Sequence, residues 1–136
     1  MKEISICILD NDLYIGSSIK EIISGFSNQI SDNYDCQIHE PTLFTTPDSL
    51  LKELAGMKNK NIILLLDGQL GGGSKMGAEY VREIKEFISS IKIVGISNSN
   101  GQNTMALSRG ADEAFPKKFI KSYDFYLLLQ NLIEKF

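Results

Sequence analysis

Three short runs of apolar residues, each followed by a polar side chain, constrain the fold of this chain more than any other feature. The runs cover residues 4–9, 62–66 and 91–96, and they lead into Asp10, Asp67 and Ser97. Short runs rich in isoleucine, leucine and valine, with polar ends, are typical of buried strands in a parallel sheet. A weaker strand is expected from Cys36 to His39, with Phe44 as its far limit, and another at 113–115.

Segments with helical periodicity separate the expected strands. Apolar residues recur at helical spacing in segments 15–26, 50–54, 80–88 and 125–136. Thr46 and Pro47 predict a helix N-cap and a first-turn proline, and a further short helix is expected at 102–109. Strands that alternate with helices predict an α/β fold, a doubly wound parallel sheet with helices on both faces.

Composition narrows the classes of function. The chain has 136 residues, 43% hydrophobic and 23% charged, which is enough for one domain with a buried core. Its net charge of -3 disfavours direct binding to nucleic acid, because a surface that grips phosphates carries a basic excess. No segment approaches the roughly 20 apolar residues that span a bilayer, and Asp10 interrupts the first run too soon for a signal peptide.

The two cysteines, Cys7 and Cys36, have neither the density of a disulfide scaffold nor the spacing of a zinc site. Cys7 lies inside an apolar run, and we expect a buried, inert thiol there. A reducing compartment is therefore expected, and we predict a cytoplasmic protein with no membrane contact.

Polar side chains gather where the expected strands end. They are Asp10, Asn11, Asp12, Asp67, Ser97, Asn98 and Lys117. Ligands of an open parallel sheet bind beyond the carboxyl ends of its strands, so these side chains are expected at one site. Hard oxygen ligands suit Mg²⁺, while Lys117 and Ser97 can donate to an anion beside it. Asp67 is then a candidate nucleophile for phosphoryl transfer, forming an acyl phosphate.

Four motifs in register carry a family resemblance. They are residues 8–12 (Ile-Leu-Asp-Asn-Asp), 64–67 (Leu-Leu-Leu-Asp), 96–98 (Ile-Ser-Asn) and 110–117 (Gly-Ala-Asp-Glu-Ala-Phe-Pro-Lys). In order and spacing they resemble the motifs of response-regulator receiver domains of two-component signalling, over essentially the whole chain. The resemblance implies a flavodoxin-like (CheY-like) sheet of five strands in the order 2-1-3-4-5.

The resemblance also implies roles for individual residues. Asp67 would accept a phosphoryl group from a histidine kinase or phosphotransfer protein, Lys117 would contact that group, and Ser97 would be the switch hydroxyl. Such a domain catalyses only its own phosphorylation and dephosphorylation and is not a turnover enzyme. The implied cofactor is Mg²⁺, held by a set of site residues: Asp10, Asn11, Asp67 and Gln69. Asp12 is either a further member of this set or the cap of the first helix.

Several residues depart from the receiver pattern. Asn11 replaces a second acid, so weaker metal binding is expected unless Asp12 compensates. Ala114 replaces an aromatic switch residue, and we expect Phe115 to point to the other face of the sheet. Lys118 replaces a proline, and a cis bond without proline costs about 2.5–4 kcal/mol, so a trans bond or a rebuilt loop is expected.

Further departures follow Asp67. Gly71 replaces a proline, and Gly77, which starts the next helix, arrives about two residues late. Gly71–Gly73 therefore predicts a longer, looser loop. Together, these departures are expected to affect the relay from the Ser97 hydroxyl to an aromatic residue more than the phosphorylation of Asp67.

Two other functions fit the same residues. A degenerate receiver would keep the fold as an interaction module that needs no phosphorylation. A small phosphohydrolase of the haloacid-dehalogenase type would use Asp10 as its nucleophile, with Asp12 at the acid/base spacing. The chain is short for that class and lacks a late acidic pair.

We expect residues 1–136 to form a single receiver domain, with no effector domain in this chain. The output would then come from a downstream effector protein or a neighbouring effector domain. A second apolar stripe, Ile120, Tyr123 and Leu127, is either extra core packing or a surface for a homodimer or partner. His39 is expected to be exposed or satisfied in the core rather than catalytic.

Overall fold

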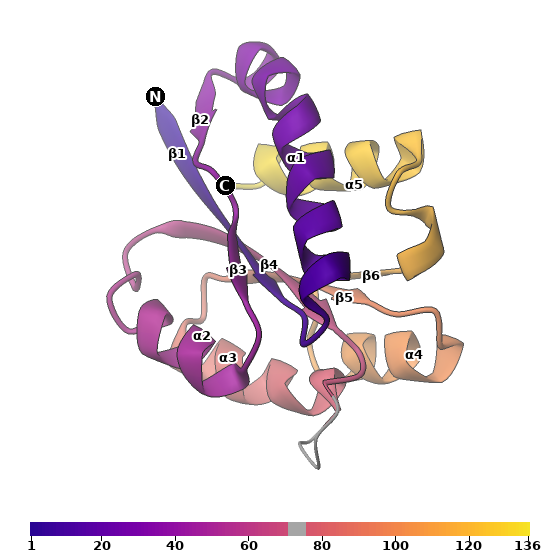
Figure 1. The fold of residues 1–136 in the computed structure, drawn as a ribbon. Coiled ribbons are helices and arrows are strands. Elements are labelled where there is room, and N and C mark those ends of the chain that lie inside the picture. Colours follow the sequence, from indigo (N-terminus) through magenta and orange to yellow (C-terminus); the bar gives the residue numbers. More distant parts are fainter. Residues whose placement is uncertain (71–75) are drawn as a thin grey trace.

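The computed structural model describes residues 1–70 and 76–136. The loop predicted at Gly71–Gly73 lies outside the described residues. Strands and helices alternate along the rest of the chain (Figure 1). In order, the elements are β1 (Lys2–Leu9), α1 (Leu13–Tyr34), β2 (Cys36–Ile38), β3 (Thr42–Phe44), α2 (Pro47–Leu54), β4 (Asn61–Asp67), the 3-10 turn η1 (Gly77–Tyr80), α3 (Val81–Phe87), β5 (Lys92–Ile96), α4 (Asn100–Ser108), β6 (Glu113–Phe115), the 3-10 turn η2 (Lys117–Phe119) and α5 (Tyr123–Glu134).

The strands form one parallel sheet in the order β2-β1-β4-β5-β6, and β3 also pairs with β1. The predicted doubly wound sheet is therefore confirmed, with its second strand split into β2 and β3. Both pieces run parallel to β1, with Cys36 opposite Lys2 and Thr42 opposite Cys7. Pro41 stands between them and has no N–H to donate to a ladder, which explains the break.

Helices cover both faces of the sheet (Figure 1). On one face α1 and α5 pack on the isoleucines of β1, and on the other lie α2, α3 and α4. Side chains alternate across a strand, so Ile4, Ile6 and Ile8 enter the first cluster while Cys7 and Leu9 enter the second. Burial on both faces is the reason that the strands read as continuous apolar runs.

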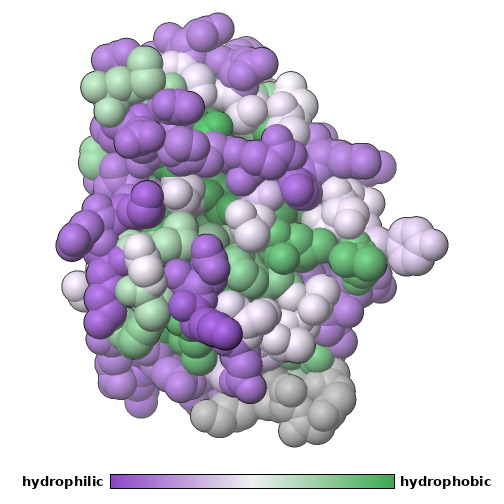
Figure 2. Space-filling view, turned by 60° about the vertical axis from the view of Figure 1, so that its left-hand side comes forward, coloured by the Kyte–Doolittle hydropathy of each residue, from purple (hydrophilic) through white to green (hydrophobic). Residues whose placement is uncertain are grey.

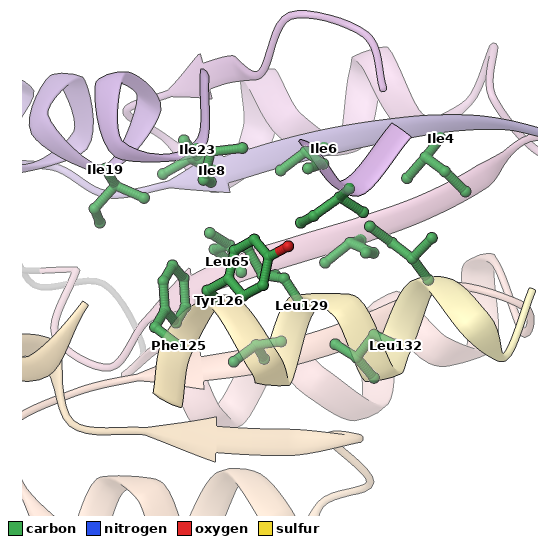
Figure 3. Packing of buried hydrophobic residues seen from close by; sticks show 14 of the residues in the cluster. Ile4, Ile6, Ile8, Ile19, Ile23, Leu65, Phe125, Tyr126, Leu129 and Leu132 are labelled. Carbon is green, nitrogen blue, oxygen red and sulfur yellow. The ribbon is translucent and has the colours of Figure 1, made fainter. Parts of the chain in front are cut away.

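The first cluster fills the space between the sheet and its two helices. Figure 3 shows Phe125, Leu129 and Leu132 of α5 beside the β1 isoleucines, with Ile19 and Ile23 of α1 on the same side of the sheet. Leu129 and Phe125 are fully buried. This layer fixes β1 and β4 relative to each other, and those two strands carry the acids of the site.

Helix α1 extends well past the predicted pattern. The apolar repeat ended at Phe26, whereas the helix continues to Tyr34 and stops at Asp35, whose left-handed backbone has φ of 47°. The last turns are mostly polar apart from buried Ile30, so the periodicity there is weak. Among the described residues, no helix is long and apolar enough to span a bilayer.

Exposed apolar side chains are scattered over several elements. Figure 2 shows a face on which apolar residues gather in the middle and hydrophilic ones surround them.

The predicted second stripe is split: Ile120 is buried and Leu127 packs against the core, whereas Tyr123 is 70% exposed. The Tyr123 ring stacks on Tyr126 with centroids 5.6 Å apart. Most of the stripe is therefore core packing.

Candidate functional site

The structure brings the predicted site residues together in one hollow at the carboxyl ends of the strands. The hollow measures about 270 Å³. Its lining is polar apart from one isoleucine: Asp10, Asn11, Asp12, Ile15, Asp67, Gln69, Ser97, Asn98, Ser99 and Lys117. All of the predicted strand-end residues are among them. Ser99 and Ile15 were missed, although Ser99 precedes a helix and carried the signal of an N-cap.

Two buried carboxylates share one ammonium group at the centre of this hollow. Lys117 Nζ lies 2.9 Å from Asp10 Oδ2 and 3.0 Å from Asp67 Oδ1. Asp10 Oδ1 accepts a hydrogen bond from the Asp12 backbone N–H at 2.9 Å, and Asp67 Oδ1 accepts one from the Gln69 N–H at 3.3 Å. The strand ends of β1 and β4 hold both acids in place, and the three side chains together carry net negative charge.

Burial and neighbouring charge shift the ionisation of this cluster. Burial raises the pKa of Asp67 and the Asp10 carboxylate raises it further, while Lys117 opposes both. Burial lowers the pKa of Lys117, but its contacts with Asp10 and Asp67 outweigh that effect and leave its pKa raised. The Lys117 ammonium therefore stays charged at neutral pH and supplies the hollow with a fixed positive charge.

The end of β6 positions Lys117. No peptide bond between described residues is cis, so the bond from Lys117 to Lys118 is trans, as predicted. The Lys118 N–H donates to Asn98 Oδ1 at 2.8 Å, which ties this loop to the end of β5. Phe115 packs on Phe125 with ring centroids 5.3 Å apart, so it faces α5 as expected. Ala114 points to the α4 side, toward Gly95.

Ser97 follows β5, is buried, and lines the same hollow as the two acids. Its backbone N–H donates to the Phe115 carbonyl at 3.1 Å, and its Oγ accepts from the Ser99 N–H at 3.0 Å. Ser99 in turn caps α4 by accepting from the Gln102 N–H at 3.2 Å. The switch hydroxyl predicted from sequence is thus held at the start of a helix, at the rim of the hollow.

Two glycines bring the chain close to Asp67. A Cβ on Gly77 would overlap the Asp67 carbonyl oxygen, and the Gly77 N–H donates to the Gly68 carbonyl at 3.0 Å. A Cβ on Gly68 would lie 2.8 Å from the Ser97 Cβ. Gly77 was noted in the sequence as a helix start, but its close approach to the Asp67 backbone could not be foreseen.

Asp12 caps the first helix. Its Oδ1 accepts hydrogen bonds from the Tyr14 and Ile15 N–H groups at 3.0 and 3.2 Å. The sequence left open whether Asp12 is a cap or a metal ligand, and the structure shows the cap while also placing Asp12 on the wall of the hollow. The sequence also singled out His39 and Cys7. His39 Nε2 contacts Glu3 at the surface. Burial raises the pKa of the Cys7 thiol to about 12.

The donor set of the hollow fits a magnesium ion. Asp10 Oδ2 is buried without a hydrogen bond from any described residue, and Lys117 contacts it as an ion pair only. In the described ranges no cluster of three or more His, Cys, Asp or Glu residues could hold a metal. Mg²⁺ needs no such cluster, because it takes one or two carboxylates and completes its shell with other oxygens and water. Asp10 and Asp67, with Asn11 and Gln69, would supply them.

Comparison with known proteins finds matches among solved structures. No protein-family model matches the chain, and no curated protein matches it. The receiver domain of NtrX from Brucella abortus is 23% identical, with a TM-score of 0.76, over 95% of this chain and 98% of that one. The beryllofluoride-activated NtrC4 receiver domain dimer is 21% identical, with a TM-score of 0.71, over 96% and 97% of the two chains.

A third match has a phosphorylated aspartic acid. It is a response regulator protein from Burkholderia pseudomallei, solved with that residue, a calcium ion and citrate. It is 16% identical, with a TM-score of 0.64, over 96% of this chain and 69% of that one. At these identities a structural likeness establishes the fold. The resemblance of the strand-end motifs is confirmed at that level: this chain has the fold of the response-regulator receiver domains.

Proposed function

We propose that residues 1–136 are a receiver domain that accepts a phosphoryl group on Asp67 and acts as a cytoplasmic signalling switch. The observation that carries the proposal is the Lys117 ammonium, 3.0 Å from the buried Asp67 carboxylate at the edge of an open hollow. A nucleophile, a fixed cation and a hydroxyl donor around one space are what transfer of a phosphoryl group to a carboxylate requires.

The reaction uses the residues of the hollow in separate roles. An Asp67 carboxylate oxygen attacks the phosphorus of a phosphohistidine on a histidine kinase or phosphotransfer protein. The P–N bond breaks, its electron pair goes to the histidine nitrogen, which takes up a proton, and an acyl phosphate forms on Asp67. Lys117 balances charge on the transferred group, and the Ser97 hydroxyl donates to one of its oxygens. A bound Mg²⁺ would neutralise further charge on the phosphoryl oxygens.

The output of such a switch depends on partners. The added charge on Asp67 shifts a conformational equilibrium that an effector protein or fused effector domain reads. The beryllofluoride-activated NtrC4 receiver domain is a dimer, which supports testing for a homodimer here. We propose that this chain likewise acts through an effector protein or a fused effector domain, and that it makes no direct contact with nucleic acid or membrane.

Incubation with acetyl phosphate and Mg²⁺, followed by intact-mass measurement, tests the proposal. We expect wild type to gain the mass of one phosphoryl group and Asp67→Asn to gain none. Absence of the increment in wild type would contradict the proposal and leave the two alternatives, the degenerate interaction module and the phosphohydrolase. Lys118→Met, which changes an exposed neighbour of Lys117, is the matched control and should gain the increment as wild type does.

The same samples separate the phosphohydrolase alternative. Turnover of a phosphomonoester that Asp10→Asn abolishes and Asp67→Asn preserves would assign Asp10 as the nucleophile. We expect no such turnover, because Asp10 Oδ1 is engaged by the Asp12 N–H and its Oδ2 is paired with Lys117.

A further inference from the structure

Helix α4 lies close to the sheet next to Ser97. A Cβ on Gly95 of β5 would be 2.9 Å from the Ala106 Cβ and 3.9 Å from the Ala114 Cβ. These three small residues let the helix backbone approach β5 and β6. The helix therefore occupies space that larger side chains would otherwise fill, and Ala114 has no ring that could move in response to Ser97.

The second turn of α4 is hydrogen-bonded directly to Ser97. Asn103 Nδ2 donates to the Ser97 backbone carbonyl at 2.9 Å. Ser99, the cap of α4, donates its N–H to the Ser97 Oγ at 3.0 Å. Ser97 is thus tied to α4 through both its carbonyl and its side chain, and a displacement of either group must move the helix or break a bond.

Two buried acceptors on the same turn lack donors. Asn103 Oδ1 and Gln102 Oε1 are buried, and no described residue donates to them. Buried polar atoms are almost always paired, so unpaired ones mark a place where an alternative arrangement can be more favourable. Among the described residues, the start of α4 thus keeps two buried acceptors unpaired, in addition to Asp10 Oδ2 in the hollow.

Gly68 links this turn to the end of the strand that carries Asp67. A Cβ at position 68 would lie 2.9 Å from the Ser97 Oγ and 3.2 Å from the Gln102 Cβ. The backbone after Asp67, the Ser97 side chain and the start of α4 are consequently packed against one another. A group added to Asp67 acts on all three.

We propose that Asn103 is a positioning residue that couples Ser97 to α4, so that phosphorylation of Asp67 moves this helix without an aromatic switch residue. The inference rests on the proposed function. Oxygens of a phosphoryl group on Asp67 draw the Ser97 hydroxyl toward them as a donor. Ser97 then shifts, the Asn103 amide follows its carbonyl, and α4 moves with it.

Beryllofluoride with Mg²⁺, used as a phosphoryl mimic on the full ¹⁵N-labelled chain, tests the coupling by NMR. In wild type, the amide shifts of Gly68 and Gln69 report binding, and those of residues 105–108 report the helix. We expect both groups to change in wild type. In Asn103→Ala and Asn103→Asp, the changes at Gly68 and Gln69 should persist while those at 105–108 fall by at least half.

The variants and control separate coupling from folding. Asn103→Asp keeps the size of the side chain and replaces the donating amide by a carboxylate, so it serves if Asn103→Ala does not fold. Thr104→Ala, at an exposed neighbouring position, should respond as wild type does. Changes of wild-type size at 105–108 in folded Asn103→Asp would overturn the coupling alone, as would loss of its Gly68 and Gln69 response. No change at Gly68 and Gln69 in wild type would overturn the proposed function, and the coupling with it.

Discussion

Asp67 and Asp10 are buried side by side, with a single ammonium group to balance them. Charged groups lose hydration when they are buried, and two like charges at one site also repel. The raised pKa of Asp67 is the consequence of both effects, burial being the larger. Burying both carboxylates beside one ammonium therefore costs the fold stability, and it suits the binding of a cation and an anion that we propose for this site.

Replacing Asp67 by asparagine should stabilise the metal-free protein. The amide keeps the shape and removes a buried charge, while Lys117 keeps Asp10 as its partner. We expect a gain of about 1 kcal/mol, roughly 3–6 °C in Tm for a domain of this size. Thermal unfolding of Asp67→Asn beside wild type in a chelating buffer measures it, and a lower Tm for the variant would contradict this account.

The gain in stability of Asp67→Asn over wild type should increase as the pH rises. A carboxyl whose pKa is raised on folding favours the folded state most when protonated, so its contribution is lost as pH rises through the folded pKa. The Tm difference between Asp67→Asn and wild type should be small at the ordinary aspartate pKa of about 3.9 and should grow toward neutral pH. A difference that shrinks over that range would contradict the direction of the Asp67 shift.

Removing the ammonium should have the opposite effect. Lys117→Met leaves two buried carboxylates without a counter-charge, and breaking such a pairing costs about 3 kcal/mol. Unfolding by urea at neutral pH without metal measures the loss. The control is Lys118→Met, whose side chain is exposed, and we expect at most about 0.5 kcal/mol there. Equal losses in the two variants would mean that Lys117 does not balance Asp10 and Asp67.

At the scale of elements, α1 depends on its cap. Asp12 Oδ1 accepts from two backbone N–H groups of the first turn. Asp12→Ala should cost about 1 kcal/mol in the free energy of unfolding, whereas Asp32→Ala, at an exposed position late in the same helix, should cost little. Unfolding curves of both, with and without Mg²⁺, also test the second role. If Asp12 acts only as a helix cap, Asp12→Ala should retain the full stabilisation by Mg²⁺.

The junction of β4 and η1 depends on a missing side chain. A Cβ on Gly77 would overlap the Asp67 carbonyl oxygen, whereas a Cβ on Gly25, in the middle of α1, meets nothing within 4 Å. Gly77→Ala should cost about 1–3 kcal/mol and displace Asp67. Gly25→Ala should gain up to about 1 kcal/mol from helix propensity. Chemical denaturation measures both, and a neutral Gly77→Ala would contradict the close approach.

The elements that the sequence specified best are those whose burial is complete. The runs of β1, β4 and β5 could be predicted because both faces of these strands are covered, and Pro47 marked the start of α2. The break between β2 and β3 and the length of α1 could not be predicted in detail. Pro41 interrupts a ladder only in the context of its partner strand, and the last turns of α1 carry few apolar residues beyond Ile30.

At the scale of the whole molecule, the site is an outcome of topology. Asp10, Asp67, Ser97 and Lys117 are far apart in sequence, and parallel strands with known polar ends were enough to predict that they meet. The sequence could not reveal the Asn103 hydrogen bond to Ser97 or the packing of Gly77 on Asp67. Both depend on how closely a helix approaches the sheet. Small residues permit a close approach, but their presence in a sequence does not predict one.

Ligand binding should stabilise the folded protein. Binding to the folded state alone stabilises it by about 2.7 kcal/mol when Mg²⁺ is present at 100 times its Kd. We expect Mg²⁺ to raise the Tm of wild type and a chelator to reverse the rise. Asp10→Asn should abolish most of the effect, because Asp10 Oδ2 is the buried oxygen left without a hydrogen bond. A Tm of Asp10→Asn that responds as wild type does would remove Asp10 from the metal site.

We propose that Asp67, assisted by Lys117 and Ser97, receives the phosphoryl group, and a crystal structure of the chain with Mg²⁺ and beryllofluoride is the sharpest test of this role. We expect beryllofluoride attached to an Asp67 carboxylate oxygen, with Lys117 Nζ and Ser97 Oγ within hydrogen-bond distance of its fluorines. Beryllofluoride attached to Asp10, or an unchanged pairing of Lys117 with both acids at saturating beryllofluoride, would contradict it.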